Sequence, residues 1–184
     1  MRSVWIALAA ILTTSLLGAL LLARALDKTN HPKPLLTPRG ARVLEDRPLG
    51  ATRVVTWHLG GHAEEPSTGL YGVTIWRDKR RLYEHRATPK TVDIGVETGD
   101  FSGDRQSDLL LFEHQDGSGD CVVYRALVIA PASIRQIYSR RLCREEGSIR
   151  LGDGGLVFRL GAQNRTTVRR WNGHRLVVVR RLPT

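Results

Sequence analysis

Three carboxylates lie close together in the segment "TGDFSGDRQSDLLLFEH", residues 98–114. Asp100, Asp104 and Asp108 are spaced four residues apart, with glycine and serine between them and an apolar run directly after them. Carboxylates crowded into one loop repel one another unless a positive charge lies among them. Hard oxygen ligands are the ones that Ca²⁺ prefers, and glycines allow the loop to bend around an ion. The segment therefore predicts a structural calcium site on a loop that a core strand anchors.

The expected ligands alternate along this loop, counted from Asp100 as position one. They are the side chains of Asp100, Ser102, Asp104 and Asp108 and the backbone carbonyl of Gln106. Alternating side chains in a tight loop converge on one point, which would give the ion several oxygen ligands. The alternative is a solvated acidic turn in which the Asp side chains cap local backbone amides.

The same residues carry a resemblance to a known family of repeats. Residues 98–112 resemble the calcium loop of FG-GAP and VCBS-type repeats, whose pattern is Asp-x-Asn/Asp-x-Asp-Gly-x-x-Asp followed by an aliphatic strand. Asp100, Asp104 and Asp108 fall on the acidic ligand positions of that pattern, and Ser102 falls on the Asn/Asp position.

One position departs from the pattern, because Arg105 stands where the repeats carry a turn glycine and so needs an awkward backbone conformation. Such repeats form blades of extracellular β-propellers. Since this chain holds one copy, the resemblance implies a single blade-like element within a compact β domain.

Short β-rich runs separated by turn signals recur from about residue 51 to the end of the chain. The ten runs cover residues 53–59, 71–77, 81–85, 92–97, 108–114, 121–129, 134–142, 155–161, 166–171 and 175–181. Asn172 and Gly173 predict a hairpin turn between the last two runs. Many short strands joined by short turns are typical of all-β folds. Residues 51–184 are therefore expected to form a compact antiparallel sandwich, barrel or partial-propeller-like domain after an N-terminal hydrophobic helix.

The N-terminus predicts export. Residues 4–23 are almost entirely apolar and uncharged, and twenty such residues in a helix would rise about 30 Å, enough to cross a bilayer. The sequence "ARA" at residues 23–25 also offers a cleavage site for a secretory signal. Residues 1–26 are thus expected to be a signal peptide or a transmembrane signal-anchor. The proline-containing residues 27–50 are expected to be an extended linker.

The location of the domain follows from these two alternatives. An uncleaved anchor places the chain in the cell membrane, with its N-terminus in the cytoplasm and the domain outside. A cleaved signal makes the domain secreted or periplasmic. Either compartment is oxidising, and the chain has an even number of cysteines. Cys121 and Cys143 are therefore expected to form a disulfide, the alternative being two buried thiols.

Charge is unevenly distributed along the chain, whose formal net charge is +10. Residues 156–184 contain no Asp or Glu but seven arginines. Arg169, Arg170, Arg180 and Arg181 are expected to attach the domain to an anionic envelope polymer, to lipid headgroups or to an acidic protein. Nucleic acid also fits the charge, but it is not an expected partner of an exported protein.

No signature of catalysis accompanies these features. The sequence contains no Gly-x-Ser-x-Gly elbow, no His-Glu-x-x-His and no P-loop. The sequence therefore favours a function other than catalysis, that of a membrane-tethered, β-rich binding or structural module in a bacterial envelope. One alternative is a subunit of an envelope membrane complex that docks through its N-terminal helix. A further alternative is a secreted hydrolase or enzyme accessory domain that uses the acidic loop as a metal site.

Overall fold

The computed structural model describes residues 36–60, 69–117, 120–152, 154–161 and 165–182. The expected signal or anchor, residues 1–26, and the first part of the expected linker lie outside these ranges. Every regular element within the ranges is a strand, so the prediction of an all-β domain is confirmed for this part of the chain. The described residues contain no helix with the length and apolar character that a membrane span requires.

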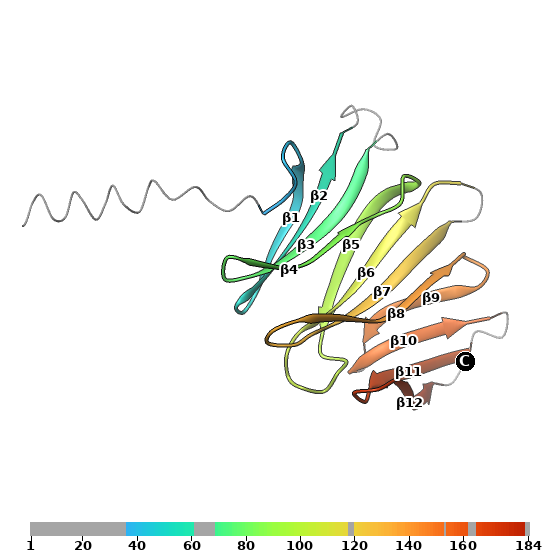
Figure 1. Cartoon of the computed structure of the whole chain (residues 1–184). Coiled ribbons are helices and arrows are strands. Elements are labelled where there is room, and N and C mark those ends of the chain that lie inside the picture. Colours follow the sequence, from blue (N-terminus) through green and yellow to red (C-terminus); the bar gives the residue numbers. More distant parts are fainter. Residues whose placement is uncertain (1–35, 61–68, 118–119, 153, 162–164, 183–184) are drawn as a thin grey trace, which may run out of the picture. The chain divides into compact units, whose positions relative to one another are not determined.

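Three four-stranded antiparallel sheets make up the described residues (Figure 1). The first sheet contains β1 (Arg42–Leu49), β2 (Thr52–Leu59), β3 (Leu70–Arg77) and β4 (Arg80–Arg86). The central sheet contains β5 (Thr91–Gly99), β6 (Asp108–Gln115), β7 (Cys121–Ile129) and β8 (Ile134–Leu142). The C-terminal sheet contains β9 (Gly147–Gly152), β10 (Gly155–Leu160), β11 (Arg165–Trp171) and β12 (Leu176–Leu182). In each sheet, strands that follow one another in the chain are hydrogen-bonded neighbours, and the described residues close no barrel.

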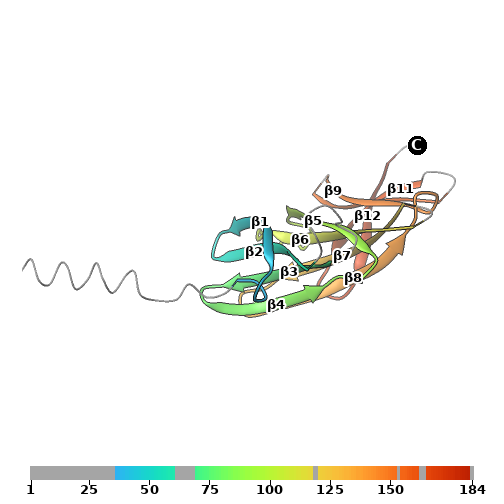
Figure 2. The same ribbon diagram turned by 90° about the horizontal axis from the view of Figure 1, so that it is seen from above.

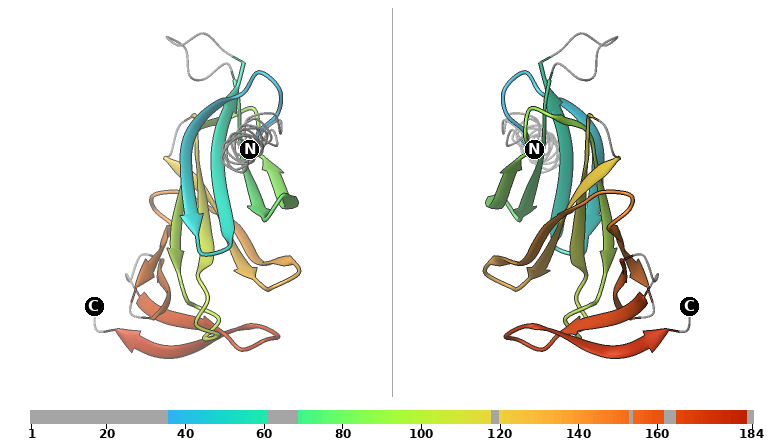
Figure 3. Two further views of the ribbon diagram at one scale, coloured as in Figure 1. Left: turned by 90° about the vertical axis from the view of Figure 1, so that its left-hand side faces the viewer. Right: turned by 90° about the vertical axis from the view of Figure 1, so that its right-hand side faces the viewer.

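The central sheet lies between the other two and is buried on both faces (Figures 1, 2 and 3). Successive side chains of a strand point to opposite faces of its sheet. On β6, Leu109 and Leu111 therefore join a core with residues of the first sheet, such as Val73 and Ile75. Leu110 joins a second core with Phe158 and other residues of the C-terminal sheet. Burial on both faces explains why β6 contains an unbroken apolar run, residues 109–112, instead of an alternating pattern.

Strand β5, at the edge of the central sheet, is hydrogen-bonded to both outer sheets. The Nη1 group of Arg47 on β1 donates to the carbonyl oxygen of Val96 over 3.0 Å. The next residue, Glu97, accepts a hydrogen bond of 2.8 Å at Oε2 from the backbone N–H of Leu151 on β9. These polar contacts fix the outer sheets against β5, in addition to the two apolar cores.

Two strands lie where the sequence patterns predict none. β1 falls within residues 27–50, the expected linker, and pairs along its length with β2. Its sequence RVLEDRPL has no apolar run because β1 is an edge strand with mostly exposed side chains, and Pro48 is compatible with an edge. β9, with the sequence GSIRLG, is short and has glycine at both ends, but Ile149 is buried in the second core. The sheet structure therefore begins at Arg42 among the described residues, nine positions before the expected start at residue 51.

The expected disulfide is confirmed. Cys121 and Cys143 are bonded, and the two cysteines are 22 positions apart in the chain. Cys121 is the first residue of β7, and Cys143 follows the last residue of β8, next to the paired residues Val122 and Leu142. The bond joins the open ends of the β7–β8 hairpin.

Candidate functional site

The acidic residues lie in the loop between β5 and β6. Gly99 and Asp108 face each other as the last residue pair of the two strands, and residues 100–107 connect them. Phe101 anchors this loop, because its side chain is fully buried in the second core. Its carbonyl oxygen also accepts a hydrogen bond of 2.9 Å from the backbone N–H of Trp171 on β11. The loop is therefore held between the central and C-terminal sheets.

Asp108 is fully buried, and its carboxylate accepts three backbone hydrogen bonds. Its Oδ2 atom accepts from Phe101 N–H over 3.1 Å and from Ser102 N–H over 2.8 Å. Its Oδ1 atom accepts from the N–H of Ile129, the last residue of β7, over 3.2 Å. Burial raises the pKa of the Asp108 carboxyl group above its ordinary value, against the opposing effect of these hydrogen bonds. The side chain joins the loop to the end of another strand.

The other two carboxylates bind amides within the loop itself. Asp100 accepts from Gly103 N–H over 2.6 Å at Oδ1 and from Arg105 N–H over 2.9 Å at Oδ2. Asp104 accepts from Gln106 N–H over 2.8 Å. The Ser102 hydroxyl donates to Asp100 at a longer 3.4 Å. The acidic side chains thus act as caps of the turn, the alternative that the sequence left open.

The backbone of the loop has a left-handed conformation at the position where the repeat pattern carries a turn glycine. Gly103 has φ of +80° and Arg105 has φ of +65°. A positive φ is ordinary for glycine but uncommon for a residue with a long side chain. Arg105 adopts it while its N–H donates to Asp100, so this hydrogen bond contributes to the stability of the unusual conformation.

As arranged, the carboxylates of the loop accept hydrogen bonds from backbone amides. No group of three or more His, Cys, Asp or Glu side chains in the described ranges is placed to hold a metal. An ion bound by Asp100, Ser102, Asp104, Asp108 and the Gln106 carbonyl would have to displace several of these hydrogen bonds.

Calcium binding stays a prediction that thermal melting tests. An ion that binds only the folded chain stabilises it by about 2.7 kcal/mol at a hundredfold excess over Kd. The melting temperature should then rise with calcium and fall with chelator, and Asp104→Ala should abolish the response. Arg105→Gly restores the glycine of the repeat pattern and should tighten binding. Melting curves of wild type and Arg105→Gly that ignore millimolar calcium would establish the loop as a capped turn only.

A second polar cluster, which the sequence reasoning missed, lies between the first and central sheets. Glu113 on β6 is fully buried. Its Oε1 atom lies 2.8 Å from Nε2 of His85 on β4 and accepts a hydrogen bond of 2.7 Å from Nε of Arg125 on β7. Arg125 also donates to the hydroxyl of Ser139 on β8. We call Glu113, His85 and Arg125 the buried triad.

The electrostatics of the buried triad favour an ionised Glu113. Burial acts to raise the pKa of Glu113, but the hydrogen bonds and electrostatic interactions with His85 and Arg125 outweigh it, so the pKa lies below its ordinary value. The Oε2 atom is buried and has no hydrogen-bond partner among the described residues. The available sequence signal was a pair of charged residues, Glu113 and Arg125, inside strands that were expected to be in the core.

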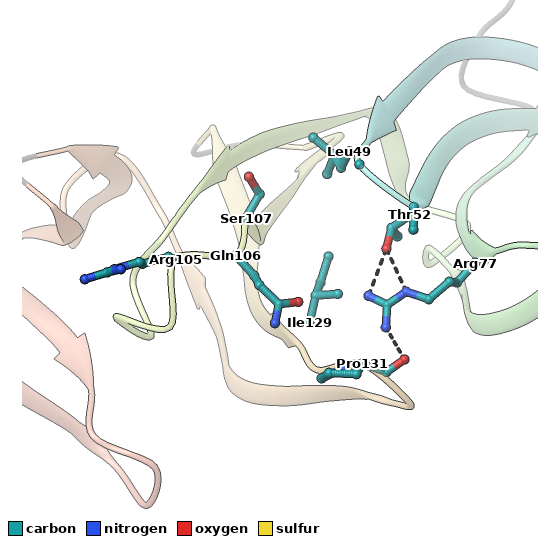
Figure 4. Close-up of a pocket in the computed structure, with 10 residues that line it drawn as sticks. Leu49, Thr52, Arg77, Arg105, Gln106, Ser107, Ile129 and Pro131 are labelled. Carbon is teal, nitrogen blue, oxygen red and sulfur yellow. Dashed lines mark hydrogen bonds between the residues drawn. The ribbon is translucent and has the colours of Figure 1, made fainter.

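A cavity of about 510 Å³ lies at the junction of the first and central sheets, beside the acidic loop. Figure 4 shows Arg77 reaching across it between Thr52 and Pro131. The Arg77 guanidinium donates to the Thr52 hydroxyl and to the carbonyl oxygens of Ala130 and Pro131. These bonds leave little donor capacity for a ligand, so Arg77 acts as a link between β2 and the β7–β8 turn.

The four arginines expected to bind an anionic surface lie on the edge strand β12 of the C-terminal sheet and on its neighbour β11. Arg169 and Arg170 are consecutive on β11, and Arg180 and Arg181 are consecutive on β12, so the members of each pair point to opposite faces. The register pairs Val168 with Arg180 and Thr167 with Arg181. One face therefore carries Arg170 and Arg180, and the other carries Arg169 and Arg181.

Two comparisons with known proteins found no relative of this chain. A scan against protein-family models and a search of the curated proteins both found no match. The function is therefore argued from the geometry and charge of the described residues.

Proposed function

We propose that this chain is an exported, membrane-tethered binding module whose β domain lies outside the cytoplasmic membrane and attaches to an anionic polymer or partner of a bacterial envelope. The carrying observation is the composition of the C-terminal sheet. Its four strands contain no Asp or Glu. Their arginines are Arg150, Arg159, Arg165, Arg169, Arg170, Arg180 and Arg181.

The distribution of ion pairs supports this assignment. In the first sheet, some of the exposed arginines lie beside carboxylates, as Arg53 lies beside Asp46 and Arg86 beside Glu84. The strands of the C-terminal sheet offer no carboxylate of their own to their arginines. A surface of one charge sign attracts a partner of the opposite sign and speeds its association. The positive charge of this sheet is therefore suited to an anionic partner.

The arrangement of the sheets supports a partial-propeller-like architecture as part of the same proposal. A propeller blade is a four-stranded antiparallel sheet, and blades pack face to face in chain order. Three successive four-stranded meanders with two cores between them have these properties. On this proposal the FG-GAP-like loop lies in the second of three blade-like sheets.

A second candidate, a subunit of an envelope complex, is favoured by the free edge of β12. This strand pairs on one side with β11, and its other edge has no strand partner in the described residues. Val178 and Val179 are about half exposed there, at 48% and 50%. An open edge strand with apolar side chains is a template for pairing with another chain. The partner in that case would be a protein strand and not a polymer.

Retention on an anionic polymer tests the proposed function. The full chain in non-ionic detergent should bind dextran sulfate beads and not uncharged dextran beads. Changing Arg169, Arg170, Arg180 and Arg181 to Gln should remove most of the retention at low salt, since each arginine near an anionic surface contributes about 1 kcal/mol. The difference should shrink at 1 M salt, where the Debye length is about 3 Å.

A matched control separates the effect of the C-terminal sheet from the effect of the net charge of the chain. Arg39, Arg42, Lys79 and Arg80 are exposed residues of the first sheet and its turns, and changing all four to Gln lowers the charge of the chain equally. This variant should retain wild-type binding. Equal loss in both variants, or a wild type that ignores the charged beads, would refute the proposed function.

A further inference from the structure

A pocket of about 320 Å³ lies where the edge strand β8 of the central sheet meets β11 and the β11–β12 turn. We call it the β8–β11 pocket. The side chains that matter below are Arg135, Tyr138, Arg169, Trp171, His174 and Arg175, which all line it. No Asp or Glu lines the pocket. Its volume lies at the small end of the range for ligand sites, about 300 Å³ upwards.

Two of the arginines are held by aromatic rings and not by carboxylates. The guanidinium carbon of Arg135 lies 5.2 Å from the centre of the Trp171 ring, and that of Arg169 lies 4.5 Å from the centre of the Phe158 ring. Stacking on a ring holds a guanidinium in place through its face. The N–H groups at its edge are then left for hydrogen bonds to another molecule.

Arg169 provides the most specific observation. Its Nε atom is buried and has no hydrogen-bond partner within the part of the chain that the structure describes. A buried N–H without a partner destabilises the fold, and more so when the group is charged. A pocket that contains such a donor gains stability from a ligand that supplies an acceptor oxygen.

The β11–β12 turn fixes the remaining basic groups at the pocket. The Asn172 side-chain oxygen accepts hydrogen bonds from the backbone N–H groups of His174 and Arg175, over 3.1 and 2.9 Å. Gly173 supplies the positive φ, +91°, that this turn needs. The turn that the Asn-Gly pair predicts is therefore present, and it holds His174 and Arg175 on the wall of the pocket.

We infer that the β8–β11 pocket binds a phosphate monoester group. Three guanidinium groups exceed what one carboxylate, with two oxygens and one charge, can satisfy. A phosphate monoester offers three terminal oxygens and up to two charges, and guanidinium groups bind it in a bidentate geometry. The inference deepens the proposed function and rests on it for the source of the ligand, an anionic envelope polymer that carries phosphate monoester groups.

Calorimetric titration of the full chain in non-ionic detergent with inorganic phosphate tests the pocket directly. Wild type should show saturable binding. Arg175→Gln changes an exposed turn residue and should weaken binding at least about tenfold, the effect of one charge-assisted hydrogen bond. Arg169→Lys keeps the charge but removes Nε, and it should weaken binding to a similar extent.

Arg80→Gln is the matched control, because Arg80 is an exposed arginine at the start of β4 and does not line the pocket. It should leave phosphate affinity unchanged. Equal weakening by Arg80→Gln and Arg175→Gln, or no saturable binding by wild type, would overturn the inference. Because Arg175 is exposed, its variant keeps the test valid even if Arg169→Lys disturbs folding, which circular dichroism would report.

Two further probes identify the source of the phosphate. Competition by glycerol 1-phosphate would support a soluble or polymer-borne phosphate. Competition only by micelles doped with phosphatidylglycerol would overturn the monoester assignment in favour of a lipid headgroup, whose phosphate is a diester with one charge. The two proposals fail in different ways. If only the phosphate inference is wrong, the chain still binds dextran sulfate. If the proposed function is wrong, the chain does not bind dextran sulfate even when phosphate binds.

Discussion

Replacing Asp108 by Ala should destabilise the domain by about 3–5 kcal/mol, because each buried donor left without a partner costs roughly 1–3 kcal/mol. The carboxylate accepts the N–H groups of Phe101, Ser102 and Ile129, and it is fully buried. Chemical unfolding of the purified chain would measure the loss. Asp108→Asn keeps one acceptor oxygen in the same shape, so it should cost less than the alanine variant.

Asp104→Ala is the control for this effect. Asp104 is exposed and accepts one hydrogen bond, from Gln106 N–H, so its loss should cost about 1 kcal/mol or less. Similar stabilities for Asp104→Ala and Asp108→Ala would contradict the role of Asp108 as a buried junction. The comparison also bears on calcium, since a loop that carboxylate repulsion destabilises would become more stable when either residue is removed.

Removing Glu113 should be the other strongly destabilising change. Glu113→Ala leaves Arg125 and His85 without their shared carboxylate between the sheets, and breaking a buried pair in this way costs about 3–5 kcal/mol. Glu84 provides the comparison, because it pairs with Arg81 and Arg86 near the surface. Glu84→Ala should cost about 1 kcal/mol or less. Unfolding curves that rank the two variants equally would argue against the buried triad as a source of stability.

The buried triad also predicts how stability depends on pH. The pKa of Glu113 is lowered in the folded chain, so the folded state binds this proton less readily than the unfolded state does. Its contribution is fully present above the unfolded pKa of about 4.3 and is lost as the pH falls through the lower folded value. Glu113→Gln should flatten this acid limb of the stability profile, whereas Glu84→Gln should leave it in place.

Hydrophobic patterns were sufficient to predict ten of the strands, but they could not reveal β1 and β9. Strands with an apolar core face carry a visible signal, as in the run from Leu109 to Phe112. β1 contributes little to either core, and β9 contributes mainly Ile149, so neither has a periodic pattern to detect. Both were recognisable only from their pairing with β2 and β10.

The residues of the acidic loop could be predicted from the sequence, but their hydrogen-bond partners could not. The spacing of Asp100, Asp104 and Asp108 located the loop, and the departure at Arg105 anticipated its positive φ. The third donor to Asp108, from Ile129, comes from 21 residues later in the chain, so the loop sequence alone holds no sign of it. Similarly, His85 reaches Glu113 only because the first sheet packs on the central one.

The order of the strands has a consequence for how the chain folds. Each sheet is a meander of consecutive strands, so its hairpins close short loops and cost little chain entropy. Such local pairing lowers the contact order and favours rapid formation of each meander. The outer meanders, however, complete the two main cores only by packing on the central one. Folding of the whole domain therefore requires the central sheet, β5 to β8, to form. A mutation that prevents this would leave the apolar faces of the two outer sheets exposed to solvent and prone to aggregation.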